Sequence, residues 1–337
     1  MKILVGMALR GHRDLNQQEI DIAIRSTNLH DVEFAHDLND SDDFWGSDID
    51  DCDVLLLLTS RRVSEEALGR AKRLRFVQKL GAPDQINVDA FKRRGISVSI
   101  LPDPGHVAVA EHTLMFILGM ARHAWRSHTA VMCGKNPLRL EPLRTTQSKR
   151  HSNWLDFPRD SFGLVADKSL GLIGFGDIAQ EVAKRARCFG MNIIYTKRTR
   201  LTPELEKEAG VTFADLPTLL RNSDFVSLHV TQLGQEKHII GIRELECMKS
   251  GAILINIAGG NQVDQKALIE FLRNGRIGGA CLDVFAVEPV PADEFRGLSN
   301  VLLTPHTAGV APLGRRFSDA IKNIEAFVNS GSVVGLR

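Results

Sequence analysis

The sequence is poor in cysteine and has no long apolar run. Its five cysteines are far apart, with no Cys-x-x-Cys pair and no spacing typical of metal ligands: Cys52, Cys133, Cys188, Cys247 and Cys281. We therefore expect reduced thiols, as in a cytoplasmic protein, and no metal site. The longest apolar stretch, residues 114–118, is too short to span a bilayer. Residues 1–6 lead directly into a strand-like run without the apolar core of a signal peptide, so no membrane association is expected.

An excess of charge of one sign is also lacking. The 42 lysines and arginines nearly balance the 41 aspartates and glutamates, which leaves a formal net charge of +1. This balance favours neither nucleic acid nor an acidic membrane surface as a partner. At 337 residues the chain is long enough for two domains, each with its own core. A globular protein that acts on a small-molecule substrate is the expectation.

Short apolar runs alternate with helical patterns along the whole chain. The runs predict strands at residues 3–7, 53–59, 75–80, 96–100, 170–173, 192–196, 225–229, 252–257, 279–283 and 301–303. Continuous Val/Leu/Ile strands separated by helices indicate parallel sheets covered on both faces. The predicted fold class is α/β, with two doubly wound parallel-sheet domains. In this arrangement a Rossmann nucleotide domain is inserted in a flavodoxin-like substrate domain.

The domain boundaries follow from the breaks in this pattern. Residues 102–105, Pro-Asp-Pro-Gly, predict a linker. The segment 313–330 has helical periodicity, and a helix that follows the last core strand can return to the first domain. We therefore expect a substrate and catalytic domain at 1–103 plus 306–337, and a dinucleotide-binding domain at 104–305.

One predicted helix, residues 111–126, is apolar on too many faces for an ordinary surface helix. It is expected to lie either between domains or against another subunit. Residues 133–161 are irregular and basic. They form either a solvated surface excursion or a loop that reaches over the cleft or over a partner subunit.

A glycine-rich turn follows the predicted strand 170–173. Gly174 allows the tight turn, and Gly176 lets the backbone approach a pyrophosphate at the start of the next helix, beside Asp177 and Ile178. Ala179 replaces the third glycine and still permits close packing of helix and strand. The free N–H groups of the helix N-terminus favour an anion there. The turn therefore predicts a dinucleotide site.

The end of the following strand selects between NAD and NADP. An acidic residue there would bind the ribose 2′-hydroxyl of NAD, but this chain has Lys197, Arg198 and Thr199 instead. Two cations can pair with a 2′-phosphate, so NADP(H) is the expected cofactor. The alternatives are that these basic residues carry no selectivity, that NAD is used, or that both cofactors are used.

An acid–base pair is expected near the C-terminal end of the core. Reduction of a carbonyl needs a hydride donor, a proton donor and positive charge near the carbonyl oxygen. His306 follows Pro305 at the end of a predicted strand, and Glu288 can fix the tautomer of its ring and favour the protonated form. The two residues predict a proton relay.

At this point the chain resembles the D-isomer-specific 2-hydroxyacid dehydrogenase family, which includes glyoxylate and hydroxypyruvate reductases. The resemblance is specific over residues 170–308 and looser before residue 100. The matching motifs are Gly174-Phe-Gly-Asp-Ile-Ala, residues 245–256, residues 275–285, Glu288-Pro289, Thr304-Pro-His306 and Val109-Ala-Glu-His112. The resemblance implies the two-domain fold described above and a homodimer formed through the helix that starts near Glu111.

The resemblance also implies roles for individual residues. His306 is the general acid/base and Glu288 is its partner. Asp283 contacts the nicotinamide carboxamide, Ile257 belongs to the cofactor contacts, and two further residues line the adenosine side, His229 and Thr231.

The substrate carboxylate is expected near Lys79, Gly81 and Ala82. In that segment Pro83 has no N–H to donate, and Gly105-His106 stands where the family usually has an asparagine.

The family's catalytic arginine is missing. It lies in an Asn-x-Ala/Ser-Arg-Gly segment, and the spacing from Glu288 places it at Gly259. In a first hypothesis the chain is an active oxidoreductase with an atypical pocket, in which another cation replaces the arginine. The candidates are Lys79 first, then Arg144, His106, Arg315 and Arg316. In a second, the protein binds dinucleotide, is catalytically impaired and acts as a sensor or scaffold. In a third, Gly259 is an introduced replacement in an ordinary reductase, although the changes at Pro83 and Gly105 favour natural divergence.

Overall fold

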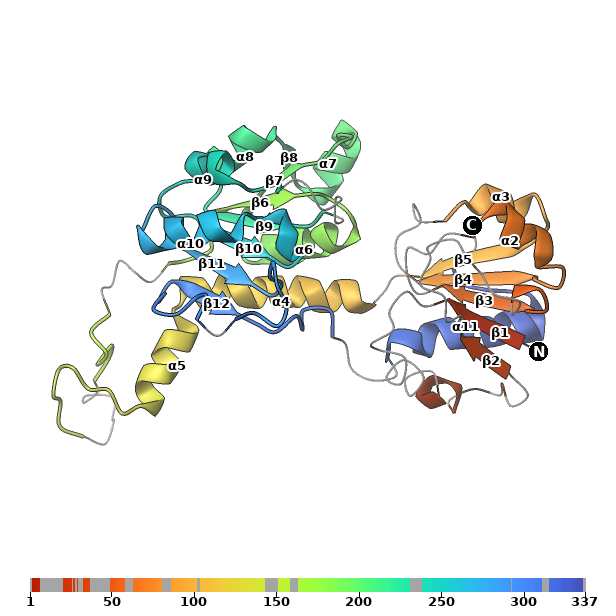
Figure 1. The fold of residues 1–337 in the computed structure, drawn as a ribbon, viewed down its shortest axis with the longest axis horizontal. Coiled ribbons are helices and arrows are strands. Elements are labelled where there is room, and N and C mark those ends of the chain that lie inside the picture. The colour runs from red at the N-terminus through yellow and green to blue at the C-terminus, as the bar shows by residue number, and fades with distance from the viewer. Residues whose placement is uncertain are drawn as a thin grey trace. The chain divides into compact units, whose positions relative to one another are not determined.

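The structure is a computed structural model in which the chain forms two compact units (Figure 1). It describes residues 2–6, 21–25, 27, 29, 33–36, 49–57, 63–80, 86–101, 104–142, 151–157, 163–230, 238–291, 293–310 and 315–335. Unit 1 comprises Met1–Ala108 and Gly309–Arg337, and unit 2 comprises Val109–Ala308. The divisions therefore fall after Ala108 and Ala308, whereas the sequence suggested residues 103 and 305. His306 lies in unit 2 because its backbone N–H donates to the Asp283 carbonyl oxygen (2.9 Å).

Unit 1 is built on a five-stranded parallel sheet in the order β2-β1-β3-β4-β5. This is the flavodoxin-like order of a doubly wound sheet. The strands are β1 (Lys2–Gly6), β2 (Glu33–His36), β3 (Val54–Leu57), β4 (Phe76–Leu80) and β5 (Ser97–Leu101), and the helices are α2 (Glu65–Arg70), α3 (Val88–Lys92) and α11 (Arg315–Ser330).

The two faces of this sheet are covered by different helices. Alternate side chains of a strand point to opposite faces. Thus Val54 and Leu56 of β3 pack with Phe317 and Ile321 of α11, so the C-terminal helix belongs to the core of unit 1. Leu55 packs on the other face in a cluster to which α2 and α3 contribute.

Unit 2 contains a seven-stranded parallel sheet in the order β12-β11-β10-β9-β6-β7-β8. This order reverses direction between β6 and β9, as in a Rossmann fold. The strands are β6 (Ser169–Ile173), β7 (Asn192–Thr196), β8 (Thr212–Phe213), β9 (Phe225–Leu228), β10 (Ile253–Asn256), β11 (Gly279–Leu282) and β12 (Val301–Leu303). The helices are α4 (Pro104–Ala121), of which the part from Val109 onward belongs to unit 2, α5 (Ala124–Met132), α6 (Asp177–Cys188), α7 (Pro203–Ala209), α8 (Leu216–Asn222), α9 (Ile242–Cys247) and α10 (Gln265–Arg273), with a 3-10 turn at Gly260–Gln262.

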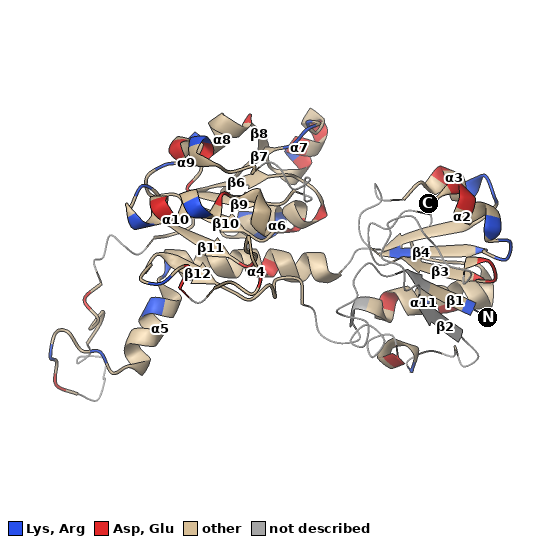
Figure 2. Cartoon of the chain, viewed as in Figure 1, with Lys and Arg blue, Asp and Glu red and all other residues tan. Residues whose placement is uncertain are grey.

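The faces of the second sheet are also covered by separate sets of helices. The cluster formed with α4 and α6 contains Leu114 and Val182. The opposite cluster, with α8, α9 and α10, contains Leu219, Leu245 and Leu268. Figure 2 shows acidic and basic residues interspersed on the helices of both units, whereas the strands are nearly free of charge. Among the described residues, each helix falls short of the length and apolar character needed to cross a membrane.

Two predictions about the middle of the chain were wrong. The expected linker at 102–105 does not include Pro104 and Gly105, because Pro104 already begins α4, where a proline without an N–H fits the first helical turn, and residues 102 and 103 lie outside the described residues. The expected helix 111–126 is divided, because α4 ends at Ala121 and α5 starts at Ala124. Between them His123 has a left-handed backbone (φ 50°), which breaks the helix.

Candidate active site

The phosphate turn joins β6 to α6 at the position where the strand order reverses. Gly174 has φ +92°, and a Cβ placed on it would lie 2.5 Å from the His229 carbonyl oxygen. Its N–H donates to the Thr196 carbonyl oxygen at the end of β7 (2.9 Å). The turn is thus held between the ends of the two neighbouring strands, and only glycine fits at position 174.

Gly176 has the opposite surroundings. A Cβ placed on it meets no atom within 4 Å, so the space beside its backbone is open. Gly176 is also the N-cap of α6, and no side chain of the described residues caps the helix there. The first N–H groups of a helix have no acceptor within the helix. The residues present therefore fit the pyrophosphate of a dinucleotide, which would approach over Gly176 and accept from this first turn, near Asp177 and Ile178.

The basic residues after β7 have different environments. Arg200 is committed to Glu206, through two hydrogen bonds of 2.8 Å each. Lys197 lies beside the phosphate turn, with its Nζ 3.5 Å from the Phe175 carbonyl oxygen. Arg198 and Thr199 are exposed. Of the three cations at this end of β7, Lys197 and Arg198 are therefore the two that can approach a 2′-phosphate.

His229 follows β9 and lies behind the phosphate turn, where its N–H donates to the Ile173 carbonyl oxygen (2.7 Å). Parts of the residue reach the surface, but both ring nitrogens are buried and have no partner among the described residues. Burial lowers the pKa of His229 to about 3, so the ring is neutral near neutral pH. A buried imidazole without a partner at this position is consistent with a contact to a bound group.

The predicted acid–base pair is in contact. The Nδ1 atom of His306 lies 2.7 Å from Glu288 Oε2, and the other oxygen of Glu288 accepts from the Phe285 N–H (3.0 Å). The backbone of the 284–288 turn thus orients the carboxylate, which in turn orients the ring. The His306 side chain is 64% exposed, so its Nε2 is available to a substrate. This is the geometry of a positioned general acid/base.

Asp283 has a role that sequence reasoning missed. Its carboxylate, which is 1% exposed, accepts from the Thr304 hydroxyl (2.6 Å) and from two backbone N–H groups, those of Thr307 (2.9 Å) and Ala308 (2.8 Å). His112 lies behind Thr304, with its Nε2 2.9 Å from the Thr304 hydroxyl oxygen. The motifs drew attention to both residues, but nothing in the sequence indicated that they meet.

Gly259 lies in the turn that follows β10. The Asn256 side chain holds this turn by donating to the Gly259 carbonyl oxygen (2.9 Å) and accepting from the Ala258 N–H (3.1 Å). Ile257, half-buried, lies in the same turn. The backbone at Gly259 is extended (φ −176°), and an added Cβ would lie 3.3 Å from Gln262 Nε2. An arginine would therefore require the Gln262 side chain to shift by a few tenths of an ångström, although this side chain is 2% exposed and its Nε2 donates to the Val230 carbonyl oxygen (3.0 Å).

The next glycine cannot be replaced in this way. An added Cβ at Gly260 would overlap the Phe285 carbonyl group. This restriction agrees with the expectation that Gly260 is the glycine of the Asn-x-Ala/Ser-Arg-Gly segment. It therefore supports the assignment of Gly259 to the arginine position.

The predicted substrate residues are only partly covered by the structure. Lys79 lies at the end of β4 within unit 1; it is 1% exposed, and its Nζ donates to the Leu80 carbonyl oxygen (2.6 Å). His106 lies in the first turn of α4. The other predicted contacts and cations lie outside the described residues or have undescribed side chains: Gly81, Ala82, Thr231, Arg144, Arg315 and Arg316.

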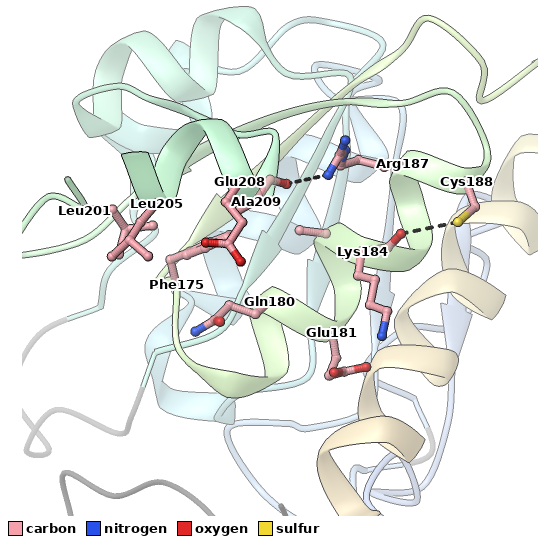
Figure 3. Close-up of a pocket in the computed structure, with 11 residues that line it drawn as sticks. Phe175, Gln180, Glu181, Lys184, Arg187, Cys188, Leu201, Leu205, Glu208 and Ala209 are labelled. Carbon is pink, nitrogen blue, oxygen red and sulfur yellow. Dashed lines mark hydrogen bonds between the residues drawn. The ribbon is translucent and has the colours of Figure 1, made fainter. Parts of the chain in front are cut away.

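A groove of about 740 Å³ lies between α6 and α7 (Figure 3). Gln180 and Lys184 of α6 line it, together with Leu205 and Glu208 of α7. Phe175 of the phosphate turn also contributes to the lining, but neither His306 nor Glu288 does. The groove is therefore separate from the predicted acid–base pair.

Comparison with known proteins gives consistent matches. The family described as "D-isomer specific 2-hydroxyacid dehydrogenase, NAD binding domain" matches residues 139–308. The chain is 37% identical over 278 residues to a glyoxylate reductase of Thermococcus litoralis, covering 82% of this chain and 80% of that protein. It is 36% identical over 274 residues to a hydroxypyruvate reductase of Thermotoga maritima, covering 80% and 82%. A solved acyclic imino acid reductase in complex with NADPH and D-Arg aligns over all of both chains with a TM-score of 0.62 and 26% identity.

Proposed function

Because the chain belongs to the D-isomer specific 2-hydroxyacid dehydrogenase family, we propose that it interconverts a small 2-oxo acid, or a related carbonyl compound, and the corresponding alcohol with NADP(H). The protein is an oxidoreductase with a nicotinamide dinucleotide cofactor. The observation that carries the proposal is the contact between His306 Nδ1 and Glu288 Oε2. It leaves the other ring nitrogen of His306 for the substrate oxygen.

The chemistry divides between cofactor and protein. When bound, the nicotinamide supplies a hydride to the carbonyl carbon, and takes it back in the reverse direction. In the reduction, His306 gives the Nε2 proton to the carbonyl oxygen, so that the product is a hydroxyl group. Glu288 accepts a hydrogen bond from His306 Nδ1 and thereby holds the tautomer and the orientation of the ring. In the oxidation the neutral ring of His306 takes the hydroxyl proton.

We infer the substrate class from the names of the relatives, and we infer an atypical substrate pocket from the glycine at position 259. Two relatives carry the names glyoxylate reductase and hydroxypyruvate reductase. A 2-oxo acid places a carboxylate beside the reacting carbonyl, and a cation near that pair polarises the carbonyl and orients the acid. Since Gly259 has no side chain, we expect weak activity on simple 2-oxo acids unless another cation takes this role.

Gly259→Arg tests this expectation. The wild type and the variant are assayed with NADPH on glyoxylate, hydroxypyruvate and related carbonyls. Gly259→Arg should raise kcat/KM for 2-oxo acids by about 10²-fold, the usual value of one well-placed electrostatic group. Gly259→Met, similar in length but uncharged, is the control. A rise with methionine as large as that with arginine would contradict the electrostatic reason.

Lys79→Met in the wild-type background tests the first candidate for a substitute cation. If Lys79 takes this role, kcat/KM should fall by more than the loss of folded protein explains. Unchanged kcat/KM in the folded fraction would remove Lys79 from the candidates.

The alternative proposal is a catalytically impaired dinucleotide-binding sensor or scaffold. The observation that favours it is again the missing side chain at Gly259. It predicts that NADPH quenches protein fluorescence on binding while no carbonyl of the panel is turned over. Turnover by the wild type at rates typical of a dehydrogenase would refute this alternative.

The cofactor preference is proposed from the residues after β7. Lys197 and Arg198 can each add a charge-assisted hydrogen bond to a 2′-phosphate, worth about 1.5–3 kcal/mol. Each alanine variant should therefore lose about 10- to 100-fold in NADPH affinity with little change for NADH. Lys207→Ala, which removes an exposed cation on α7, is the control. Equal losses for both cofactors would contradict a 2′-phosphate contact.

A homodimer is proposed from apolar side chains around α5. None of the nine residues of α5, all of which the structure describes, is buried. Met132 is 73% exposed, and Val131, Leu138 and Trp154 are exposed as well. Apolar side chains gathered in this way are typical of an interface. Light scattering should give the mass of two chains, and Met132→Glu should shift it toward one. A monomeric wild type would contradict the proposal.

A further inference from the structure

The loop that carries His306, residues 304–308, has an unusual conformation. His306 has a left-handed backbone (φ 55°), which costs a non-glycine residue about 1–2 kcal/mol. Such a conformation persists only where the surroundings fix it. The position of the His306 ring therefore depends on whatever holds this loop.

Asp283 makes most of the hydrogen bonds that fix the loop 304–308. Its backbone carbonyl oxygen accepts from the His306 N–H (2.9 Å). Its carboxylate accepts from the N–H groups of Thr307 and Ala308, one on each oxygen. Asp283 itself follows β11, and its N–H donates to the Asn256 carbonyl oxygen (3.0 Å). A single residue thus fixes both ends of the left-handed turn to the sheet.

The carboxylate is held in turn by Thr304 and His112. A threonine hydroxyl has one hydrogen, and a carboxylate only accepts. At 2.6 Å from Asp283 Oδ1, the Thr304 hydrogen must point to Asp283. The Thr304 oxygen can then only accept from His112 Nε2, at 2.9 Å. The direction of the chain is therefore fixed, from His112 through Thr304 to Asp283, and the Nε2 of His112 carries a proton.

His112 is suited to a fixed donor. Its ring meets the edge of Phe116 (centroids 4.6 Å apart, interplanar angle 85°), which holds the ring plane. Burial lowers the pKa of His112, and the Asp283 charge opposes this shift only in part. The Nε2 proton is present in both the neutral and the charged ring, so the donor persists in either state.

We propose that His112 and Thr304 are positioning residues: they orient the Asp283 carboxylate, which holds the loop 304–308 and thereby presents His306 to the substrate. The fixed hydrogen-bond direction makes the arrangement rigid, because no member can rotate without leaving a buried group unpaired. The kinetic consequence rests on the proposed function of His306, but the structural consequence does not.

The first experiment is independent of turnover and uses ring ¹⁵N signals and amide hydrogen exchange of the full chain. The wild type should show His112 with a proton on Nε2 and His306 with a proton on Nδ1. Thr304→Val should speed amide exchange at Thr307 and Ala308 by at least about tenfold, the loss of about 1.4 kcal/mol. It should also allow both tautomers at His306.

A matched control lies on the same helix as His112. Thr113 is buried, and its hydroxyl bonds only the Val109 carbonyl oxygen among the described residues (2.9 Å). Thr113→Val removes a buried hydroxyl without touching the chain to Asp283. It should leave the exchange at Thr307 and Ala308 unchanged. A His112 signal without an Nε2 proton, or equal exchange in the two valine variants, would overturn the proposal.

The second experiment measures kinetics. Thr304→Val and His112→Leu should lower kcat by about 10- to 100-fold, since misplacing a catalytic group by about 1 Å has effects of this size. NADPH affinity should change less than about threefold, and Thr304→Ser should restore kcat. If kcat and its pH profile are unchanged in a variant with faster exchange, the positioning role is refuted. A wild type that turns over no carbonyl refutes the proposed function instead, and the NMR results still decide whether the loop is held in this way.

Discussion

The two glycines of the phosphate turn make a prediction that separates folding from binding. Gly174→Ala adds a Cβ that would lie 2.5 Å from the His229 carbonyl oxygen and 2.8 Å from Val230 Cγ1, at a φ of +92°. Gly176→Ala adds a Cβ that meets nothing within 4 Å, at a φ of −95°. The same change two residues apart should therefore affect different properties. Gly174→Ala should mainly lower the stability of unit 2, and Gly176→Ala should mainly lower the affinity for the dinucleotide.

The magnitudes follow from these contacts. A left-handed backbone costs an L-residue about 1–2 kcal/mol, and overpacking against fixed neighbours costs about 1–3 kcal/mol. Gly174→Ala should thus destabilise unit 2 by about 3 kcal/mol, which lowers the Tm of a unit of this size by about 6–12 °C. Gly176→Ala should cost only about 0.5–1 kcal/mol, because alanine is a poorer N-cap than glycine but the added methyl group meets no other atom.

Dinucleotide binding should reverse the order. The methyl group of Gly176→Ala would occupy the open space over which the pyrophosphate is expected to pass, so NADPH affinity should fall by about 10- to 100-fold. The assay pairs thermal unfolding of the cofactor-free protein with NADPH titration followed by fluorescence at a temperature where both variants are folded. Normal NADPH binding by Gly176→Ala, or a Gly174→Ala variant as stable as the wild type, would refute the geometric reasoning.

Three further predictions concern stability. Arg200 and, to a smaller extent, Tyr195 lower the pKa of Glu206 from 4.5 to about 2, so its charge stabilises the fold above pH 4.5 and this contribution is lost as the pH falls toward 2. Urea midpoints of the wild type and Glu206→Gln should therefore converge over that range, and a constant difference would contradict the ion pair. Burial lowers the pKa of His229 from 6.5 in the unfolded chain to about 3 in the folded protein. Between these two pH values the unfolded chain binds a proton that the folded protein does not, so stability falls as the pH is lowered from 6.5 to 3. His229→Asn should reduce the slope of the unfolding free energy against pH by about 1.4 kcal/mol per unit there, and an unchanged slope would show that the ring is not buried. The buried amide of Asn323 donates to Gln78 Oε1, Ser99 Oγ and the Val334 carbonyl oxygen. Asn323→Ala should therefore destabilise unit 1 by about 3–4 kcal/mol and make the C-terminal residues accessible to carboxypeptidase. Resistance to carboxypeptidase equal to that of the wild type would contradict this prediction.

The sequence contained enough information for the α/β fold class and for most strand positions. The runs at Asn192–Thr196 and Val301–Leu303 were predicted with the bounds that the structure has, because a turn residue, Gly190 or Asn300, precedes each apolar run. β2 was missed, since Glu33–His36 begins and ends with polar residues and has no continuous apolar run. The break at His123 was missed because neither glycine nor proline marks it.

The site shows a similar division. The phosphate turn could be predicted because the glycine spacing itself determines the backbone path. The contact between His306 and Glu288 was anticipated from motifs in a known order. The chain from His112 to Asp283 could not be anticipated, because its first two members lie 192 residues apart in sequence. Neither the register that brings them together nor the direction of their hydrogen bonds is contained in a local pattern.

The glycines at 259 and 260 are subject to different packing constraints. At Gly260 the Phe285 carbonyl group leaves no room for any side chain, so glycine is required by packing. At Gly259 the backbone is extended, and a side chain would require the buried Gln262 side chain, whose Nε2 donates to the Val230 carbonyl oxygen (3.0 Å), to shift by a few tenths of an ångström. The effect of glycine at position 259 is that the turn after β10 carries no side chain there. The turn therefore provides no side-chain charge at position 259, and the Gly259→Arg experiment tests whether this affects the substrate preference.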